Sequence, residues 1–308
     1  MAARDGVELC VYRWLPAGKP KAVVQIAHGL AEHGGRYARL AQSLTGAGFA
    51  VYANDHRGHG QTCKDRDQLG FLGARNGWRS CLDDLWMLNR HIAAEHPGIP
   101  IVLFGHSMGS TMAEQFMAEH GDALAGVVLS GSSGQPTMLA VVGRLITRVE
   151  RWRVGARGRS KLAQALTFGA FNKPFAPART AFDWLSRDPG EVDKYVSDPL
   201  CGFPASIQLW IDLLDGGKAA SSPKDRSRIP KTLPIYVISG DRDPVSGNTK
   251  QLRAMLSAYR AAGLNVQNRF YHDARHELFN ETNRDEVTKE LLEWLERIIA
   301  VEQASRPA

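Results

Sequence analysis

Residues 101–109 read IVLFGHSMG, and a helical pattern, Met108–His120, follows directly. The apolar run Ile101–Phe104 predicts a buried strand, and Gly-x-Ser-x-Gly between a strand and a helix predicts a sharp turn that holds a nucleophilic serine. The glycines on either side of Ser107 avoid the clashes that Cβ atoms would cause in this crowded turn. The five residues alone also fit a Gly-rich turn with a buried serine, so the flanking strand and helix decide for a nucleophile.

Short apolar runs alternate with helical patterns on both sides of this stretch. Strands are expected at Val7–Trp14, Ala22–Ala27, Ala50–Asn54, Ile101–Phe104, Ala125–Ser130, Pro234–Ser239 and Val266–Tyr271. Helices are expected at Tyr37–Thr45, Trp78–His96, Met108–His120, Asn248–Ala262 and Arg284–Val301, and the first four end directly before Gly or Pro. This alternation predicts an α/β fold with a mostly parallel, doubly wound sheet.

The alternation stops between Gln135 and Ile229, where the pattern is helical, rich in Arg and interrupted by Pro. We therefore predict a catalytic core at residues 1–134 and 230–308, with an inserted helical cap, or lid, at residues 135–229. Open α/β sheets bind their ligands at the carboxyl ends of the strands. The cap is expected to cover that edge.

The composition is that of a globular protein. The 308 residues are 44% hydrophobic and 23% charged, which allows a sizeable core. No apolar run reaches the roughly 18–20 residues that span a bilayer, and Met1–Lys19 has no signal-peptide core. We therefore expect a cytoplasmic enzyme. Four scattered cysteines without a Cys-x-x-Cys pair favour neither a zinc site nor a disulfide framework: Cys10, Cys63, Cys81 and Cys201.

Two later strand ends carry a candidate acid and a candidate base. A nucleophile turn of this kind is followed along the chain by an acid and then by a histidine. His276 would take the proton of Ser107, and Asp243 would orient the imidazole and stabilise the imidazolium. Asp241 is the alternative acid, but we expect its side chain to cap the turn. His272 is the alternative base, but it lies close to the strand alternation and is expected to pack.

The loop of residues 28–35 follows the predicted strand Ala22–Ala27 and is rich in glycine. One donor to an oxyanion should be the backbone N–H of Met108, and we expect the second at Leu30 in this loop. Three side chains there could also bind a metal ion: His28, Glu32 and His33. We expect them to hold the loop by hydrogen bonds instead, and we predict no metal and no cofactor.

A second glycine-rich turn, residues 55–60, reads DHRGHG. It has neither the Gly-x-Gly-x-x-Gly pattern nor the lysine of a phosphate-binding loop. We interpret it as structural support for the site, with Arg57 in a buried ion pair.

The formal net charge of +6 equals the local excess of residues 144–161, which hold seven basic residues and one acid, Glu150. Apolar residues interleave with the basic ones: Leu145, Ile146, Val149, Trp152 and Val154. This pattern is typical of a helix that lies on a membrane surface. It fits peripheral contact with an anionic membrane, or equally a solvated basic face whose apolar side packs on the core. Nucleic acid is not expected, because no recognition motif accompanies the charge.

Together these segments resemble the monoacylglycerol lipase and lysophospholipase group of α/β-hydrolases, also described as serine aminopeptidase-like hydrolases. The resemblance spans Asp5 to Val301 and is carried by HGLAEH (28–33), Arg36-Tyr37, DHRGHG (55–60), GHSMG (105–109), Asp198-Pro199-Leu200, Asp243 and His276. It implies the α/β-hydrolase fold, a triad of Ser107, Asp243 and His276, and oxyanion donors at Leu30 and Met108. It also implies hydrolysis of esters with one long acyl chain. Two departures are a first strand that is short or absent and a cap unusually rich in arginine.

Several functions stay open at this point. Hydrolysis of a monoacylglycerol or a smaller ester through an acyl-enzyme fits the motifs best. A peptidase that releases N-terminal residues would need acidic groups for the substrate amine, which Glu191, Asp193 and Asp198 could supply, although the Arg-rich stretch argues against it. A non-catalytic receptor would not need an acid and a base beside the serine. Acyl-chain length, head group and oligomeric state do not follow from the sequence.

Overall fold

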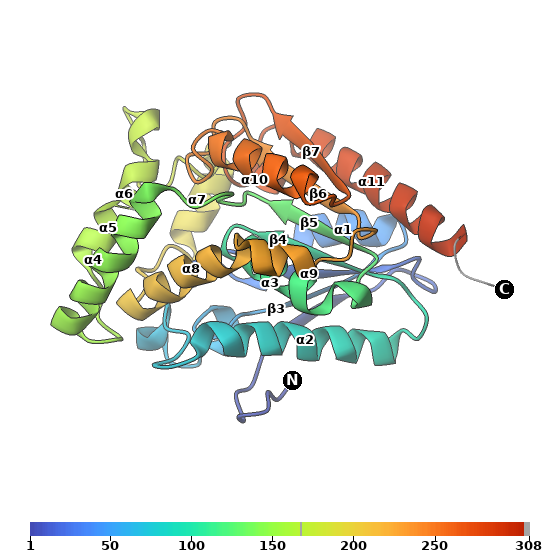
Figure 1. The fold of residues 1–308 in the computed structure, drawn as a ribbon, viewed down its shortest axis with the longest axis horizontal. Helices are drawn as coiled ribbons and strands as arrows, with labels where there is room; N and C mark the ends of the chain where they lie inside the picture. Colours follow the sequence, from blue (N-terminus) through green and yellow to red (C-terminus); the bar gives the residue numbers. More distant parts are fainter. Residues whose placement is uncertain (167, 305–308) are drawn as a thin grey trace.

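The computed structural model describes residues 1–166 and 168–304. One seven-stranded sheet runs through the molecule in the order β1-β3-β2-β4-β5-β6-β7 (Figure 1). The strands are β1 (Val11–Trp14), β2 (Val23–Ala27), β3 (Ala50–Asn54), β4 (Ile101–His106), β5 (Gly126–Ser130), β6 (Ile235–Gly240) and β7 (Val266–Tyr271). Only β1 is antiparallel to its neighbour β3, and all other neighbours are parallel. The predicted α/β class with a mostly parallel sheet is confirmed.

Helices cover both faces of the sheet, as its apolar strands require. Every residue of β2 to β6 is buried. The core helices are α1 (Ala38–Gly46), α2 (Gly77–Glu95), α3 (Met108–His120), α10 (Lys250–Ala261) and α11 (Arg284–Ala304). Side chains of α2, α3 and α10 share one apolar cluster with the sheet, and those of α1 and α11 share the other. The chain is therefore doubly wound around the sheet.

Two of the described element starts differ from the prediction by two residues or more. β1 begins at Val11 rather than Val7, because Glu8 bridges back to Ala2 and Leu9 donates its N–H to the carbonyl of Met1. Helix α10 begins at Lys250 rather than at residue 248, because residues 248 and 249 both have positive φ. Hydrophobic periodicity does not detect such local backbone reversals.

Between β5 and β6 the structure describes helices and no strand. These are α4 (Met138–Val154), α5 (Lys161–Leu166), α6 (Phe168–Phe171), α7 (Pro189–Ser197), α8 (Ile207–Ala220) and α9 (Pro223–Arg228). In Figure 1, α4, α5 and α6 lie to the left of the sheet, and α8 runs from them towards the core. Helix α8 contacts α4 as well as α2 and α3, so it ties the inserted segment to the core. Among the described residues, no helix is long and apolar enough to cross a bilayer.

Candidate active site

Ser107 stands at the turn between β4 and α3, where its backbone has φ +52° and ψ −116°. A left-handed conformation is unusual for a residue with a side chain and marks a strained turn. The neighbouring glycines are needed: a Cβ atom on Gly109 would lie 2.0 Å from the carbonyl oxygen of Ala27, and one on Gly105 would lie 2.4 Å from the carbonyl oxygen of Gly109. The turn thus projects Ser107 from the end of a central strand.

His276 and Asp243 meet in the interior at the ends of β7 and β6. Nδ1 of His276 lies 3.0 Å from Oδ2 of Asp243, and both side chains are buried. Burial by itself lowers the pKa of His276, but the Asp243 carboxylate and its hydrogen bond raise that pKa above its ordinary value of 6.5. Because Nδ1 donates to the carboxylate, Nε2 is the nitrogen left to act as a base.

The alternative acid and base form a separate pair at the surface. Oδ2 of Asp241 lies 3.1 Å from Nδ1 of His272, and its Oδ1 accepts the N–H of Asp273 at 2.8 Å. The side chain of His272 is 88% exposed, so the expectation that it packs is wrong. Asp241 does hold a turn, but it is the turn after β7, because β6 and β7 are neighbours and end side by side.

One cavity brings the sequence-predicted residues together. Its core side is formed by Gly29, Leu30, His106, Ser107, Met108 and His276, and its cap side by Trp184, Leu185, Tyr195, Trp210 and Leu213. The cap side is thus largely apolar. The cavity holds about 60 Å³, whereas pockets for small ligands usually hold about 300–1,000 Å³. A substrate with a long chain therefore requires the cap to shift.

The loop after β2 approaches the serine closely. A Cβ atom on Gly29 would lie 2.8 Å from Oε1 of Glu32 and 3.2 Å from Cβ of Ser107, so a larger residue would have to displace these neighbours. The N–H of Gly29 donates to Oε1 of Glu32 at 2.6 Å, which fixes the turn that presents Leu30. Met108 is the first residue of α3, and the first N–H groups of a helix have no partner within it. The role of the Leu30 and Met108 amides as oxyanion donors stays a prediction.

Buried imidazoles surround this loop without forming a second base. Nε2 of His28 accepts the N–H of His56 at 2.9 Å, which ties the loop to the glycine-rich turn after β3. Burial lowers the pKa of His56 to about 3 and that of His106 to about 4, so both are neutral near pH 7. In the same turn, Arg57 donates to Asp84 at 2.6 and 2.9 Å. The predicted ion pair of Arg57 is confirmed.

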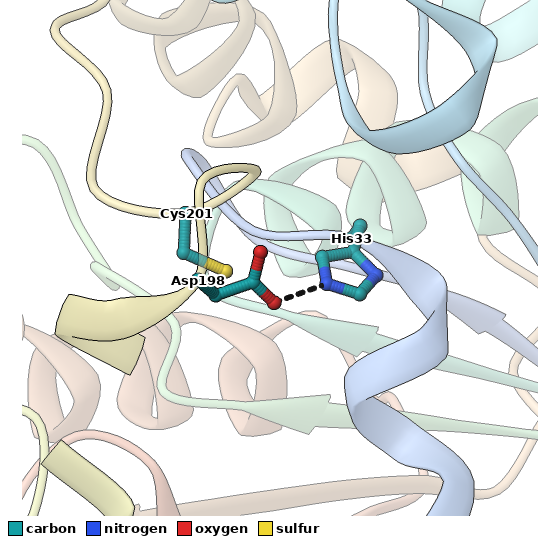
Figure 2. A group of neighbouring side chains, drawn as sticks. All are labelled: His33, Asp198 and Cys201. Carbon is teal, nitrogen blue, oxygen red and sulfur yellow. Dashed lines mark hydrogen bonds and ion pairs between the residues drawn. The ribbon is translucent and has the colours of Figure 1, made fainter. Parts of the chain in front are cut away.

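Of the described side chains, His33, Asp198 and Cys201 form one group whose potential metal-ligand atoms lie within 4.8 Å of one another (Figure 2). Both oxygens of Asp198 are already engaged, by Nε2 of His33 at 3.0 Å and by the N–H of Leu200 at 2.8 Å. Nδ1 of His33 is buried without a partner, whereas a metal-bound imidazole usually donates its second N–H. The group is therefore better explained as a hydrogen-bonded contact between the cap and the core than as a metal site.

Trp184 and Glu277 belong to the site but were missed from the sequence. The ring of Trp184 lies 5.0 Å from the ring of His276, and Glu277 lines the same cavity. Trp184 comes from the middle of the cap, where no periodic signal predicts which side chain reaches the core. Glu277 directly follows the candidate base, and that adjacency was the available signal.

The family described as serine aminopeptidase, S33, matches residues 18–283. This chain belongs to that family. Among curated members, it is 30% identical to the monoacylglycerol lipase of Mycolicibacterium smegmatis, over 96% of this chain and 95% of that protein. It is also 30% identical to human monoglyceride lipase, over 98% and 91% of the two chains.

The similarity to solved structures shows that this chain has the α/β-hydrolase fold. A highly thermostable carboxyl esterase from Bacillus coagulans, in complex with glycerol, superposes with a TM-score of 0.90 and 28% identity, over 97% of both chains. A lipase in an open form superposes with a TM-score of 0.87, again at 28% identity and 97% coverage of each. The protein is an α/β-hydrolase and a serine hydrolase of the monoacylglycerol lipase and lysophospholipase-like group.

Proposed function

We propose that this serine hydrolase cleaves carboxylic esters with a single acyl chain, monoacylglycerols above all, through an acyl-enzyme. The observation that carries the proposal is His276, which is bonded to the buried Asp243 and lines the same cavity as Ser107 at its strained turn. Such an arrangement suits nucleophilic catalysis, because the imidazole can accept the serine proton while the carboxylate stabilises the resulting charge.

The proposed reaction has two halves. Oγ of Ser107 attacks the ester carbonyl carbon while Nε2 of His276 takes its proton, and the N–H groups of Leu30 and Met108 stabilise the oxyanion. The C–O bond to the alcohol then breaks, and His276 returns the proton to the leaving oxygen. A water molecule, deprotonated by His276, releases the fatty acid and restores Ser107. No metal or cofactor enters this scheme.

The preference for a single acyl chain rests on the cap and on the relatives. Apolar side chains from the cap face Ser107, among them Leu185, Trp210 and Leu213. Two relatives that match over nearly the full length are named monoacylglycerol or monoglyceride lipases. A carboxylesterase for small esters is the second candidate, favoured by the high similarity to the Bacillus coagulans carboxyl esterase. Dependence of the rate on acyl-chain length separates the two.

The aminopeptidase alternative is less well supported. It requires unpaired carboxylates near Ser107 to bind the substrate amine, and the three acidic residues considered for this role line no part of the described cavity beside the serine. Each of them is paired: Glu191 with Arg39, Asp193 with Arg179 and Asp198 with His33.

We also propose that the cap contacts anionic membranes through the basic stretch 144–161 and α4, which overlaps it from Arg144 to Val154. Six of its apolar side chains are between 49% and 90% exposed: Met138, Val141, Val142, Leu145, Val149 and Trp152. Their spacing of mostly three or four residues aligns them on one helix face, and exposed patches of this kind mark interaction surfaces. Arg144 and Arg148 both pair with Asp215, which offsets part of the positive charge of the stretch. The proposed membrane contact therefore depends more on the apolar stripe than the charge excess suggests.

The first experiment is the release of fatty acid from 1-oleoylglycerol by the wild type and by Ser107→Ala. We expect rapid release, and a loss in kcat of about 10⁶-fold in the variant, because the nucleophile is removed. Cleavage of short p-nitrophenyl esters without oleate release would favour the small-ester enzyme. Cleavage of amino-acid p-nitroanilides alone would favour the peptidase, and inertness towards all three would contradict the proposal in favour of a receptor.

A further inference from the structure

A single buried arginine lies between the two loops that carry the candidate site. Nη1 of Arg36 lies 2.8 Å from Oε2 of Glu32 and 2.6 Å from Oε1 of Glu277, and Nη2 lies 2.7 Å from Oε2 of Glu277. Its side chain is 12% exposed. Glu32 belongs to the oxyanion loop and Glu277 directly follows His276, so one guanidinium joins the two loops.

Glu32 and Glu277 each make further hydrogen bonds to segments around the site. Oε1 of Glu32 accepts the N–H of Gly29 at 2.6 Å and the hydroxyl of Tyr37 at 2.9 Å. The N–H of Glu277 donates to the carbonyl of Leu185 in the cap at 2.8 Å. A displacement of the guanidinium would therefore change the positions of the oxyanion loop, the base and the cap.

The charges of this group are maintained despite burial. Burial alone lowers the pKa of Arg36, but the Glu277 and Glu32 carboxylates raise it well above its ordinary value. Burial likewise raises the pKa of Glu277, but Arg36 overcomes this and lowers it to about 2. Both groups therefore stay ionised around neutral pH. The planar guanidinium meets the carboxylate through two parallel hydrogen bonds, which fix orientation as well as distance.

The cap rests on the same group. The ring of Tyr195 lies 4.9 Å from the guanidinium carbon of Arg36, and its hydroxyl donates to the carbonyl of Ala31 at 2.9 Å. Trp184 covers His276. The described cap is thus seated on the arginine and on the base at once.

We propose that Arg36 and Glu277 are positioning residues for ester hydrolysis at Ser107: their bidentate pair holds the imidazole of His276 in register with the oxyanion loop. The proposal rests on the proposed function, since it assigns these residues a role in that reaction. Neither side chain touches the reacting atoms. Their effect is on the placement and the protonation of His276.

Groups from five segments face His276 and determine the surroundings in which it titrates. Asp243 faces it from the loop after β6, Glu277 from its own loop and Glu32 from the oxyanion loop, and all three favour the imidazolium. His106 faces it from the end of β4, with a distance of 4.8 Å between the rings, and is neutral. The cap presents Trp184 to it, which carries no charge. Loss of the Glu277 charge therefore favours the neutral imidazole.

The test compares kcat and its pH dependence in Glu277→Gln, Arg36→Lys and the control Glu191→Gln. In Glu277→Gln we expect kcat to fall by about 10²-fold, as a displacement of about 1 Å can cause, and the acid limb to move to lower pH. Arg36→Lys keeps the positive charge but loses the two parallel hydrogen bonds of the guanidinium. We therefore expect kcat to fall while the acid limb of the pH profile stays at the same pH. Glu191→Gln breaks a similar pair with Arg39, at 2.8 and 3.1 Å, away from the cavity, and should resemble the wild type.

A wild-type kcat and acid limb in Glu277→Gln, or an equal loss in Glu191→Gln, would overturn the proposal. Circular dichroism checks folding. If Glu277→Gln does not fold, Glu277→Asp takes its place, with a lower kcat and an unchanged limb expected. The NMR titration of His276 in Ser107→Ala, with and without Glu277→Gln, needs no turnover, and its midpoint should fall when the charge is removed. If the wild type hydrolyses no ester, the proposed function fails while this titration still tests the coupling of Glu277 to His276.

Discussion

Asp243 and Asp241 lie two residues apart, yet their surroundings give them different expected roles. Asp243 is buried against His276, whereas Asp241 pairs with an exposed His272. Asp243→Asn should lower kcat by about 10⁴-fold, because the imidazole loses its orienting partner. Asp241→Asn, the matched control, should leave kcat close to that of the wild type. Steady-state kinetics of the two variants decide, and a larger loss in Asp241→Asn would show that the acid is wrongly assigned.

The raised pKa of His276 sets the direction of the pH dependence. The reaction needs the neutral imidazole, and Asp243, Glu277 and Glu32 hold its proton more tightly than in a free histidine, despite burial. Activity should therefore be lost as pH falls, with a midpoint above 6.5 for kcat/KM. The measurement is a pH–rate profile with a soluble ester. A flat profile from about pH 5 to 8 would contradict a histidine base in this environment.

At the residue scale, the motif could predict which side chains share the site but not how they are supported. Gly-x-Ser-x-Gly, Asp243 and His276 stand at strand ends, and parallel strands bring such ends to one edge. The choice of Asp243 over Asp241 rested on its place beyond the strand end. The cover of His276 by Trp184 depends on side-chain packing between residues about 90 positions apart in the chain, which no local pattern encodes.

Helix α4 carries a prediction at the scale of a single element. Trp152 is 90% exposed at the end of its apolar stripe, so Trp152→Ser should weaken binding to vesicles that contain phosphatidylglycerol. Val301→Ser, on α11 and 66% exposed, is the matched control and should bind as the wild type does. Co-sedimentation at two salt concentrations is the measurement. Binding that ignores salt, or no binding at all, would rule out docking on anionic lipid.

Periodicity predicted the positions of the elements that have long apolar runs. It did not predict the features that depend on polar contacts. The strand Ile101–Phe104 was predicted from its apolar run, and the structure extends it by two residues to His106. For α4 the sequence left open whether the apolar side packs on the core. Leu145 and Val149 are 67% and 58% exposed, which excludes that packing for both. Asp215, the partner of Arg144 and Arg148, lies about 70 residues away and could not be foreseen.

The stability of the whole molecule should depend on pH through a carboxyl group remote from the chemistry. Glu114 of α3 is buried, which raises its pKa to about 7 although Tyr259 and Ser132 donate to it. The folded state therefore holds this proton more tightly than the unfolded chain. The stability that this bound proton contributes is complete below the ordinary pKa of 4.5 and is lost as pH rises through about 7. The loss in the free energy of unfolding is on the order of 3 kcal/mol.

Glu114→Gln should remove this dependence, because the amide keeps the shape and does not ionise. Unfolding by urea at pH 5 and at pH 8 measures the effect: the wild type should lose more stability than the variant between the two values. Equal losses would mean that Glu114 ionises in the folded protein as easily as in the unfolded chain.

The contact between Trp184 and His276 gives the molecule an optical reporter of its own. Indole emission is quenched by a neighbouring imidazolium and is sensitive to the polarity around the ring. Since Trp184 covers the base from the cap, we expect its emission to change when the base takes up a proton and when the cap moves away from the base. Every catalytic cycle would then be accompanied by a change in fluorescence, readable in a stopped-flow instrument without any attached dye.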